Sequence, residues 1–153
     1  MEETLREHDG ETVELLLTKP YHIIDILPHR VPEQSEGQYF EIERHFLSAP
    51  VFNGICSKFA SLILKLNCYK DILMSDEGDF WTENPSPEDL LERFTPKDGK
   101  CGWVYFLLNG KKTLITFNGE DHYMTVYNLK GELLSLISRI AASEGLFVWE
   151  APQ

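Results

Sequence analysis

The clearest pattern in the chain is a run of apolar residues at helical spacing in its first half. Between Val51 and Met74, large apolar side chains recur three or four residues apart. The stripe consists of Ile55, Phe59, Leu62, Leu66, Tyr69 and Leu73, and Ile63 widens it. This period places the side chains on one face of an α-helix. The pattern therefore predicts a long amphipathic helix over about residues 52–74, with its apolar face in the core.

The last third of the chain shows a different pattern, with short β-rich segments separated by turn signals. The segments cover residues 103–108, 113–117 and 122–127, and the turn signals are Asn109-Gly110 and Asn118-Gly119. Asn-Gly suits a tight hairpin turn because both central residues adopt positive φ. We therefore predict a three-stranded antiparallel meander over about residues 103–127. Apolar spacing between Leu133 and Ala141 then predicts a helix that ends near Gly145, and residues 146–149 read as a final strand.

Two-residue turns would fix how the strands of this meander pair. They place Tyr105 opposite Leu114, and Leu114 opposite Tyr123. One face then carries Trp103, Tyr105, Leu107, Leu114, Thr116, Tyr123, Thr125 and Tyr127. The other carries Val104, Phe106, Leu108, Thr113, Ile115, Phe117, Met124 and Val126, with His122 near one end. Because the second set is more uniformly apolar, we expect it to take the helices and form the core.

The remaining segments are less regular. Residues 12–17 and 21–27 suit either short strands or a helical turn, with Pro20 and Pro28 as breaks, and residues 38–47 read as a strand. Ser86 followed by Pro87 is typical of a helix start, so a short helix is expected to run to about Phe94. These elements together predict a single α+β domain over residues 1–153.

The net charge of the chain limits the classes of partner that it is expected to bind. The chain has 25 acidic and 14 basic residues and a formal charge of −11, with no basic run longer than Lys111-Lys112. Phosphate backbones and anionic membranes are repelled by such a protein, so neither nucleic acid nor a membrane is an expected partner. The first residues lack the pattern of a signal peptide, and the three cysteines form no Cys-x-x-Cys pair, which favours a cytoplasmic protein with reduced thiols.

Residues with catalytic or metal-binding chemistry are present but not in a recognisable spacing. The closest histidines, His22 and His29, lie seven residues apart across a proline, so neither a metal nor a cofactor is predicted. One hypothesis is a small cytosolic enzyme that acts on a soluble metabolite. Its nucleophile would be Cys101 or Cys56, and its base would be His22, His45 or His122.

The favoured hypothesis is a non-enzymatic binding or self-association module. Its binding residues would be Trp103, Tyr105, Tyr123 and Tyr127, because aromatic side chains with a polar tip suit interfaces. The partner would be a second copy of the chain or another protein. The alternative is that the N-terminal segments or the final strand cover this face. His122, half-buried at a sheet end, is expected to be mostly neutral, with Glu120 and Asp121 opposing that tendency.

Overall fold

The computed structural model describes residues 6–97, 102–118 and 121–151. Within these ranges the chain forms a seven-stranded antiparallel sheet in the order β3-β2-β4-β5-β6-β1-β7. The strands are β1 Tyr21–Asp25, β2 Ile72–Ser75, β3 Thr82–Glu83, β4 Trp103–Leu108, β5 Thr113–Asn118, β6 Tyr123–Tyr127 and β7 Phe147–Glu150. The helices are α1 Arg6–Leu16, α2 Glu36–Phe46, α3 Val51–Asn67, α4 Pro87–Arg93 and α5 Gly131–Ser143, and a 3₁₀ turn, Glu33–Ser35, precedes α2. The predicted α+β class is confirmed.

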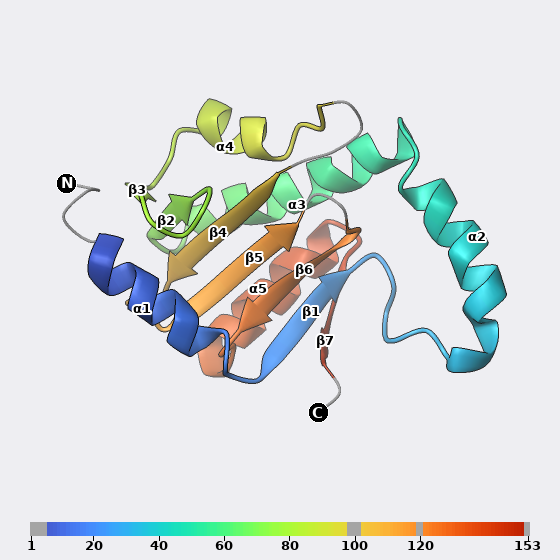
Figure 1. Ribbon diagram of the computed structural model, residues 1–153, viewed down its shortest axis with the longest axis horizontal. Coiled ribbons are helices and arrows are strands. Elements are labelled where there is room, and N and C mark those ends of the chain that lie inside the picture. Colours follow the sequence, from blue (N-terminus) through green and yellow to red (C-terminus); the bar gives the residue numbers. More distant parts are fainter. Residues whose placement is uncertain (1–5, 98–101, 119–120, 152–153) are drawn as a thin grey trace.

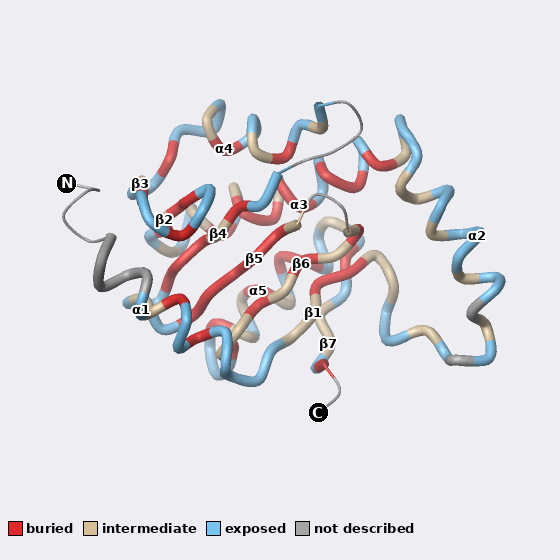
Figure 2. Tube along the Cα trace, viewed as in Figure 1, coloured by how far each residue is buried: buried red, intermediate tan, exposed pale blue. Residues whose placement is uncertain are grey.

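The main core lies between one face of the sheet and helices α3, α4 and α5. In Figure 1, α3 and α5 run behind the strands, and the strands facing them are largely buried in Figure 2. The sheet contributes Val104, Phe106, Leu108, Ile115, Phe117, Met124 and Val126 to this core. Phe117 packs against Phe59 of α3 with ring centroids 5.3 Å apart, and Phe106 stacks on Phe94 at 6.1 Å. The face predicted to form the core is therefore the one that does so.

The pairing of the meander strands differs from the prediction, although the faces do not. Leu114 lies opposite Leu107 and Tyr127, rather than opposite Tyr105 and Tyr123. The first turn is wider than Asn109-Gly110, because Asn109, Gly110 and Lys111 all adopt positive φ and β5 starts only at Thr113. Gly119, in the second predicted turn, lies outside the described residues. The pairings shift by two and by four residues, and since both shifts are even, the side chains of β4, β5 and β6 stay on their predicted faces. His122, which precedes β6 and was predicted on the core-side face, lies instead beside Asp25 in a hollow with Ile23 and Tyr123.

Two other predictions are corrected by the structure. The long helix ends at Asn67, and Leu73 and Met74 belong to β2, where Asn84 bonds the amide and the carbonyl of Ile72. Residues 38–47, predicted as a strand, lie almost entirely in α2. Phe40 and Ile42 are about half exposed on this helix, so its apolar residues are not buried together along one face.

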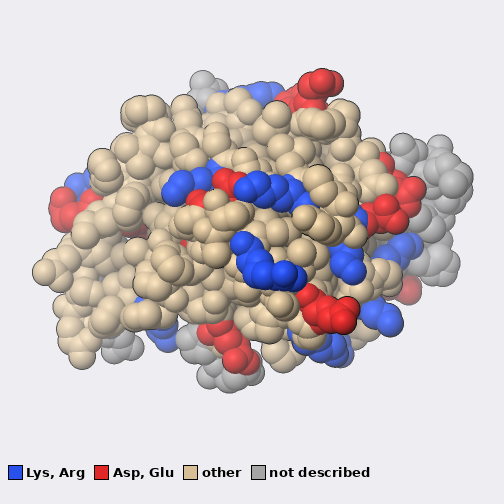
Figure 3. Space-filling model, turned by 180° about the vertical axis from the view of Figure 1, so that it is seen from behind, with Lys and Arg blue, Asp and Glu red and all other residues tan. Residues whose placement is uncertain are grey.

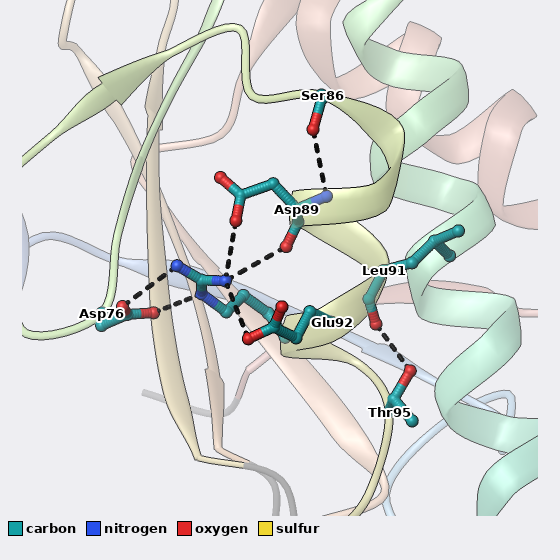
Figure 4. Close-up of polar contacts among 7 residues, drawn as sticks. Asp76, Ser86, Asp89, Leu91, Glu92 and Thr95 are labelled. Carbon is teal, nitrogen blue, oxygen red and sulfur yellow. Dashed lines mark hydrogen bonds and ion pairs between the residues drawn. The ribbon is translucent and has the colours of Figure 1, made fainter.

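The ambiguous N-terminal segments are resolved, and the predicted start of α4 is confirmed. Residues 12–16 belong to α1, and residues 21–25 form β1. The Ser86 hydroxyl accepts a hydrogen bond from the Asp89 amide at 3.1 Å, with Pro87 at the first helical position. This cap is visible in Figure 4.

Among the described residues, no single helix has the length and apolar character needed to cross a membrane. The segments Gly37–Phe46 and Val51–Asn67 meet the criterion of length and composition only as a pair, and they are bent by 77°.

Candidate functional site

The second face of the sheet is only partly covered. Val13 and Leu16 of α1 pack on Trp81, Leu107 and Leu114, which form a small cluster separate from the main core. The part of the sheet formed by β6 and β1 lies between α1 and α2, and no described helix crosses it in Figure 1. We call this second face the open sheet face. Of the predicted aromatic residues on it, Tyr123 and Tyr127 belong to β6, and Trp103 and Tyr105 belong to β4.

All four predicted binding residues line one hollow of about 290 Å³ on this face. The ring of Trp103, which is 53% exposed, stacks on that of Tyr105 with centroids 6.2 Å apart and planes 23° apart. Tyr123 and Tyr127 contribute the opposite wall, and Leu17, just after α1, closes one side. The structure therefore brings together residues from three strands and from the end of the first helix. We call this feature the aromatic hollow.

A larger hollow of about 540 Å³ adjoins it and shares Tyr123. It lies between β1, the segment 27–32 and the start of α2, and its walls include Ile23, Tyr39, Phe40 and Trp149. The Trp149 indole donates a hydrogen bond to the Leu27 carbonyl at 3.2 Å, which ties the segment to β7. This second hollow has a buried charged group in its wall.

That group is the pair formed by Asp25 and His122, which are 5% and 2% exposed. His122 Nδ1 lies 3.1 Å from Asp25 Oδ1, and the same oxygen accepts a hydrogen bond from the Ile26 amide at 2.7 Å. On the other side of the ring, His122 Nε2 lies 3.1 Å from the Tyr39 hydroxyl. Tyr39 in turn donates to Glu43 Oε2 at 2.9 Å, so the chain of polar groups connects β1 to α2.

The directions of these hydrogen bonds indicate a protonated imidazole. Tyr39 has one hydroxyl proton, which it donates to Glu43, so its oxygen is left to accept a proton from His122 Nε2. His122 Nδ1 also needs a proton to donate to the Asp25 carboxylate. Burial alone lowers the pKa of His122, but the hydrogen bond and charge of Asp25, with the charge of Glu43, outweigh it and raise that pKa above its ordinary value.

This arrangement corrects the expectation that His122 is mostly neutral. The carboxylates that hold its proton are Asp25, which is 97 residues away in the chain, and Glu43 of α2. Glu120, which was expected to act on it, lies outside the described residues. Burial and the hydrogen bond to Glu43 raise the pKa of Tyr39, so the phenol keeps its proton. Both ring nitrogens of His122 are engaged, and the ring is better suited to a structural tie than to a general base.

The remaining residues of the cysteine and histidine hypothesis are dispersed. Cys56 is completely buried in α3, and Cys101 lies outside the described residues. His22 Nδ1 is buried and lacks a hydrogen-bond partner among the described residues. His45 is exposed at the end of α2, where its ring lies against Phe46. A buried thiol in the core is inaccessible to a soluble metabolite.

A third hollow, of about 540 Å³, lies on the other side of Trp103 and is dominated by charged groups. The guanidinium group of Arg93 in its wall is held by two bonds to Asp76, at 2.6 and 3.3 Å, and one to Asp89 at 3.0 Å. Figure 4 shows these carboxylates converging around the end of α4. The positive charge of Arg93 is therefore neutralised within the protein.

The described part of the chain contains no group of three or more His, Cys, Asp or Glu side chains arranged to hold a metal ion. Sequence reasoning missed Asp25, Tyr39 and Glu43, because no spacing rule connects them to His122. The chain matches no family model, no curated protein and no solved structure.

Proposed function

We propose that the protein is a non-enzymatic binding module that holds a partner protein on its open sheet face. The observation that supports this is the aromatic hollow, in which four rings gather beside an uncovered part of the sheet. Aromatic residues are enriched at the centres of protein interfaces, where they bury a large area and keep a polar tip available. A half-exposed Trp103 stacked on Tyr105 is the natural anchor of such a surface.

Intramolecular packing explains only part of this face. Helix α1 covers Leu107 and Leu114, and Tyr105 and Tyr127 pack at the edge of that cluster. Trp103 remains exposed, and Tyr123 borders two hollows. Helix α1 therefore covers one end of the face and leaves the rest accessible.

A different protein is favoured over a second copy of this chain. Two copies each carry a formal charge of −11, so their long-range interaction is repulsive. We expect light scattering to show a monomer at physiological salt. A stable dimer that Trp103→Ala converts to a monomer would assign the face to self-association instead.

Photo-crosslinking from the face itself tests the proposal. A photoreactive amino acid at Thr125, in the aromatic hollow, should yield an adduct with a specific protein in cells. The matched control carries the same group at Ser135, which is exposed on α5 on the opposite side of the sheet. The captured protein is then purified, and its affinity for the unmodified chain is measured.

We expect Trp103→Ala to weaken that affinity tenfold or more, since truncating an interface anchor typically costs about 2 kcal/mol or more. Tyr69→Ala, which removes an exposed ring remote from this face, should change the affinity less than twofold. Equal adduct formation from positions 125 and 135, or equal effects of the two alanine variants, would contradict the proposal.

A further inference from the structure

The lining of the aromatic hollow is suited to a positive charge. Besides its four rings it contains the Asp121 carboxylate, the Asn118 amide and the hydroxyls of Thr116 and Thr125. No lysine, arginine or histidine occurs among the described residues that line it. The hydroxyls and the amide can accept or donate hydrogen bonds, and Asp121 supplies the full negative charge among the described lining residues.

The size of the hollow keeps a guest close to the rings. A sphere of about 290 Å³ has a radius of about 4 Å, and a cation is attracted to an aromatic face within about 6 Å of the ring centroid. The hollow also has room for the head of an arginine or lysine side chain. Tryptophan gives the strongest attraction of this kind, and Trp103 is the most exposed ring in the wall.

The pKa of Tyr123 indicates the sign of the electrostatic field at this end of the hollow. Burial raises the pKa of Tyr123, and the negative charge of Asp121 is the next largest cause. Asp25 and Glu43, the two carboxylates in contact with His122, act on the pKa of Tyr123 in the same direction but more weakly. A field that disfavours a phenolate also favours a bound cation.

Charge is distributed unequally over the whole protein. Residues 51–70 and 130–145, which comprise α3, α5 and their flanks, carry five of the fourteen basic residues and only two of the twenty-five acidic ones. Lys and Arg side chains gather across the middle of the face seen from behind in Figure 3, the side on which α3 and α5 lie. The excess of carboxylates thus lies outside α3 and α5, in parts of the chain that include the strands of the open face and also α4, which carries Glu88, Asp89 and Glu92.

We propose that the aromatic hollow receives an arginine or lysine side chain from a basic segment of the partner protein. The inference rests on the proposed function and specifies the chemistry of the partner. The cation lies over Trp103 and Tyr105, and Asp121 compensates its charge. The overall negative charge of the protein accelerates the encounter with a basic partner.

A capped pentapeptide, Gly-Ser-Arg-Ser-Gly, serves as the probe, and the same peptide with citrulline in place of arginine is its neutral isostere. Binding is followed by the amide and indole resonances of the full chain in NMR titrations. The arginine peptide should shift the Trp103 indole resonance in a saturable manner and bind at least fivefold more tightly than the citrulline peptide. Raising the salt from about 20 to about 300 mM should weaken only the arginine peptide.

Variants assign the effect to the hollow. Trp103→Leu should abolish the saturable shifts, and Asp121→Asn should weaken the arginine peptide about threefold or more while leaving the citrulline peptide unchanged. Tyr69→Ala, on the α3 side, is the control and should bind as the wild type does.

Equal binding of the two peptides, or shifts that map to α3 and α5, would overturn the inference. The two proposals fail separately. If position 125 crosslinks to a specific protein but the arginine peptide binds no better than the citrulline peptide, the proposed binding face is retained and the proposed cation site is rejected. If the arginine peptide is preferred but no specific crosslinked adduct forms, the proposed cation site is retained and the proposed partner protein is rejected.

Discussion

Asp25→Asn removes the charge that holds His122 protonated, while keeping the shape of the side chain. The oxygen of the new carboxamide can still accept the hydrogen bond from the Ile26 amide, so local backbone geometry is preserved. The imidazole is 2% exposed, and among the described residues the other carboxylate paired with it is Glu43, at 3.6 Å from Nε2. The variant therefore tests the charge of Asp25 separately from the hydrogen bonds that connect β1, α2 and the segment before β6.

The expected loss of stability depends on pH. Removing one partner of a buried ion pair typically costs about 3–5 kcal/mol, and this should apply near pH 5.5, where the imidazole is charged in the wild type. As pH rises through the folded pKa of His122, the imidazole loses its proton, so the loss should fall toward the value of a hydrogen bond to a charged group, about 2 kcal/mol. The destabilisation by Asp25→Asn should thus grow as pH falls.

The sign follows from the pKa of His122. In the wild type this pKa is raised above the unfolded value of 6.5, so the stabilisation is complete below about pH 6.5 and is lost as pH rises through the folded pKa. In the variant, burial becomes the dominant influence and lowers the pKa. The contribution of His122 to stability then falls as pH decreases, which is the opposite trend.

Urea unfolding at pH 5.5 and pH 8, followed by tryptophan fluorescence, measures both trends. An NMR titration of the His122 ring gives its pKa directly. Glu41→Gln, in which an exposed carboxylate becomes an amide, is the control and should change the free energy of unfolding by less than about 0.5 kcal/mol at either pH. A loss for Asp25→Asn that is equal at the two pH values would show that the charge of Asp25 does not hold the proton on His122.

Substitutions at two further residues test polar groups that fix the architecture. Tyr39→Phe keeps the ring packed edge-on against His122 but removes the hydroxyl between His122 and Glu43. The free energy of unfolding, measured in urea, should therefore fall by about 1–2 kcal/mol. An unchanged value would show that the hydroxyl is dispensable. Asn84→Ala removes hydrogen bonds to Asn67, Asp71 and the Ile72 amide at a residue with φ of 45°, and should cost about 2–3 kcal/mol by thermal unfolding. Asn84→Gly should cost about 1 kcal/mol less than Asn84→Ala, because glycine accepts the positive φ without strain, and equal losses would contradict this.

Local periodicity was sufficient to find the elements that dominate the core. The period of three to four residues through Ile55, Phe59 and Leu66 identified α3, since one helical face is buried along its length. Alternation along 103–127 identified the meander and assigned its two faces correctly. These patterns can be read without the tertiary structure, because the apolar residues of a helix or strand with one buried face recur in the sequence at the period of that element.

Turn geometry and exposed helices were less predictable. The Asn109-Gly110 signal located a turn but not its width, because the additional positive φ at Lys111 is not encoded by a turn-forming residue type. The pattern of residues 38–47 predicts a strand instead of α2, because Phe40 and Ile42 are exposed and do not mark a buried helical face. Its conformation depends on attachments through Tyr39 and Phe46 to residues far away in the chain.

Residue patterns alone were enough to define the α+β class, the core-facing strands and the four aromatic residues of the candidate site. The folded arrangement was needed to show that these aromatics surround one hollow beside Asp121, and that Asp25, Tyr39 and Glu43 meet at His122. The difference lies in the range of the interactions. Hydrophobic periodicity reflects neighbours within one element, whereas the partners of a buried charge come from whichever elements the fold brings together.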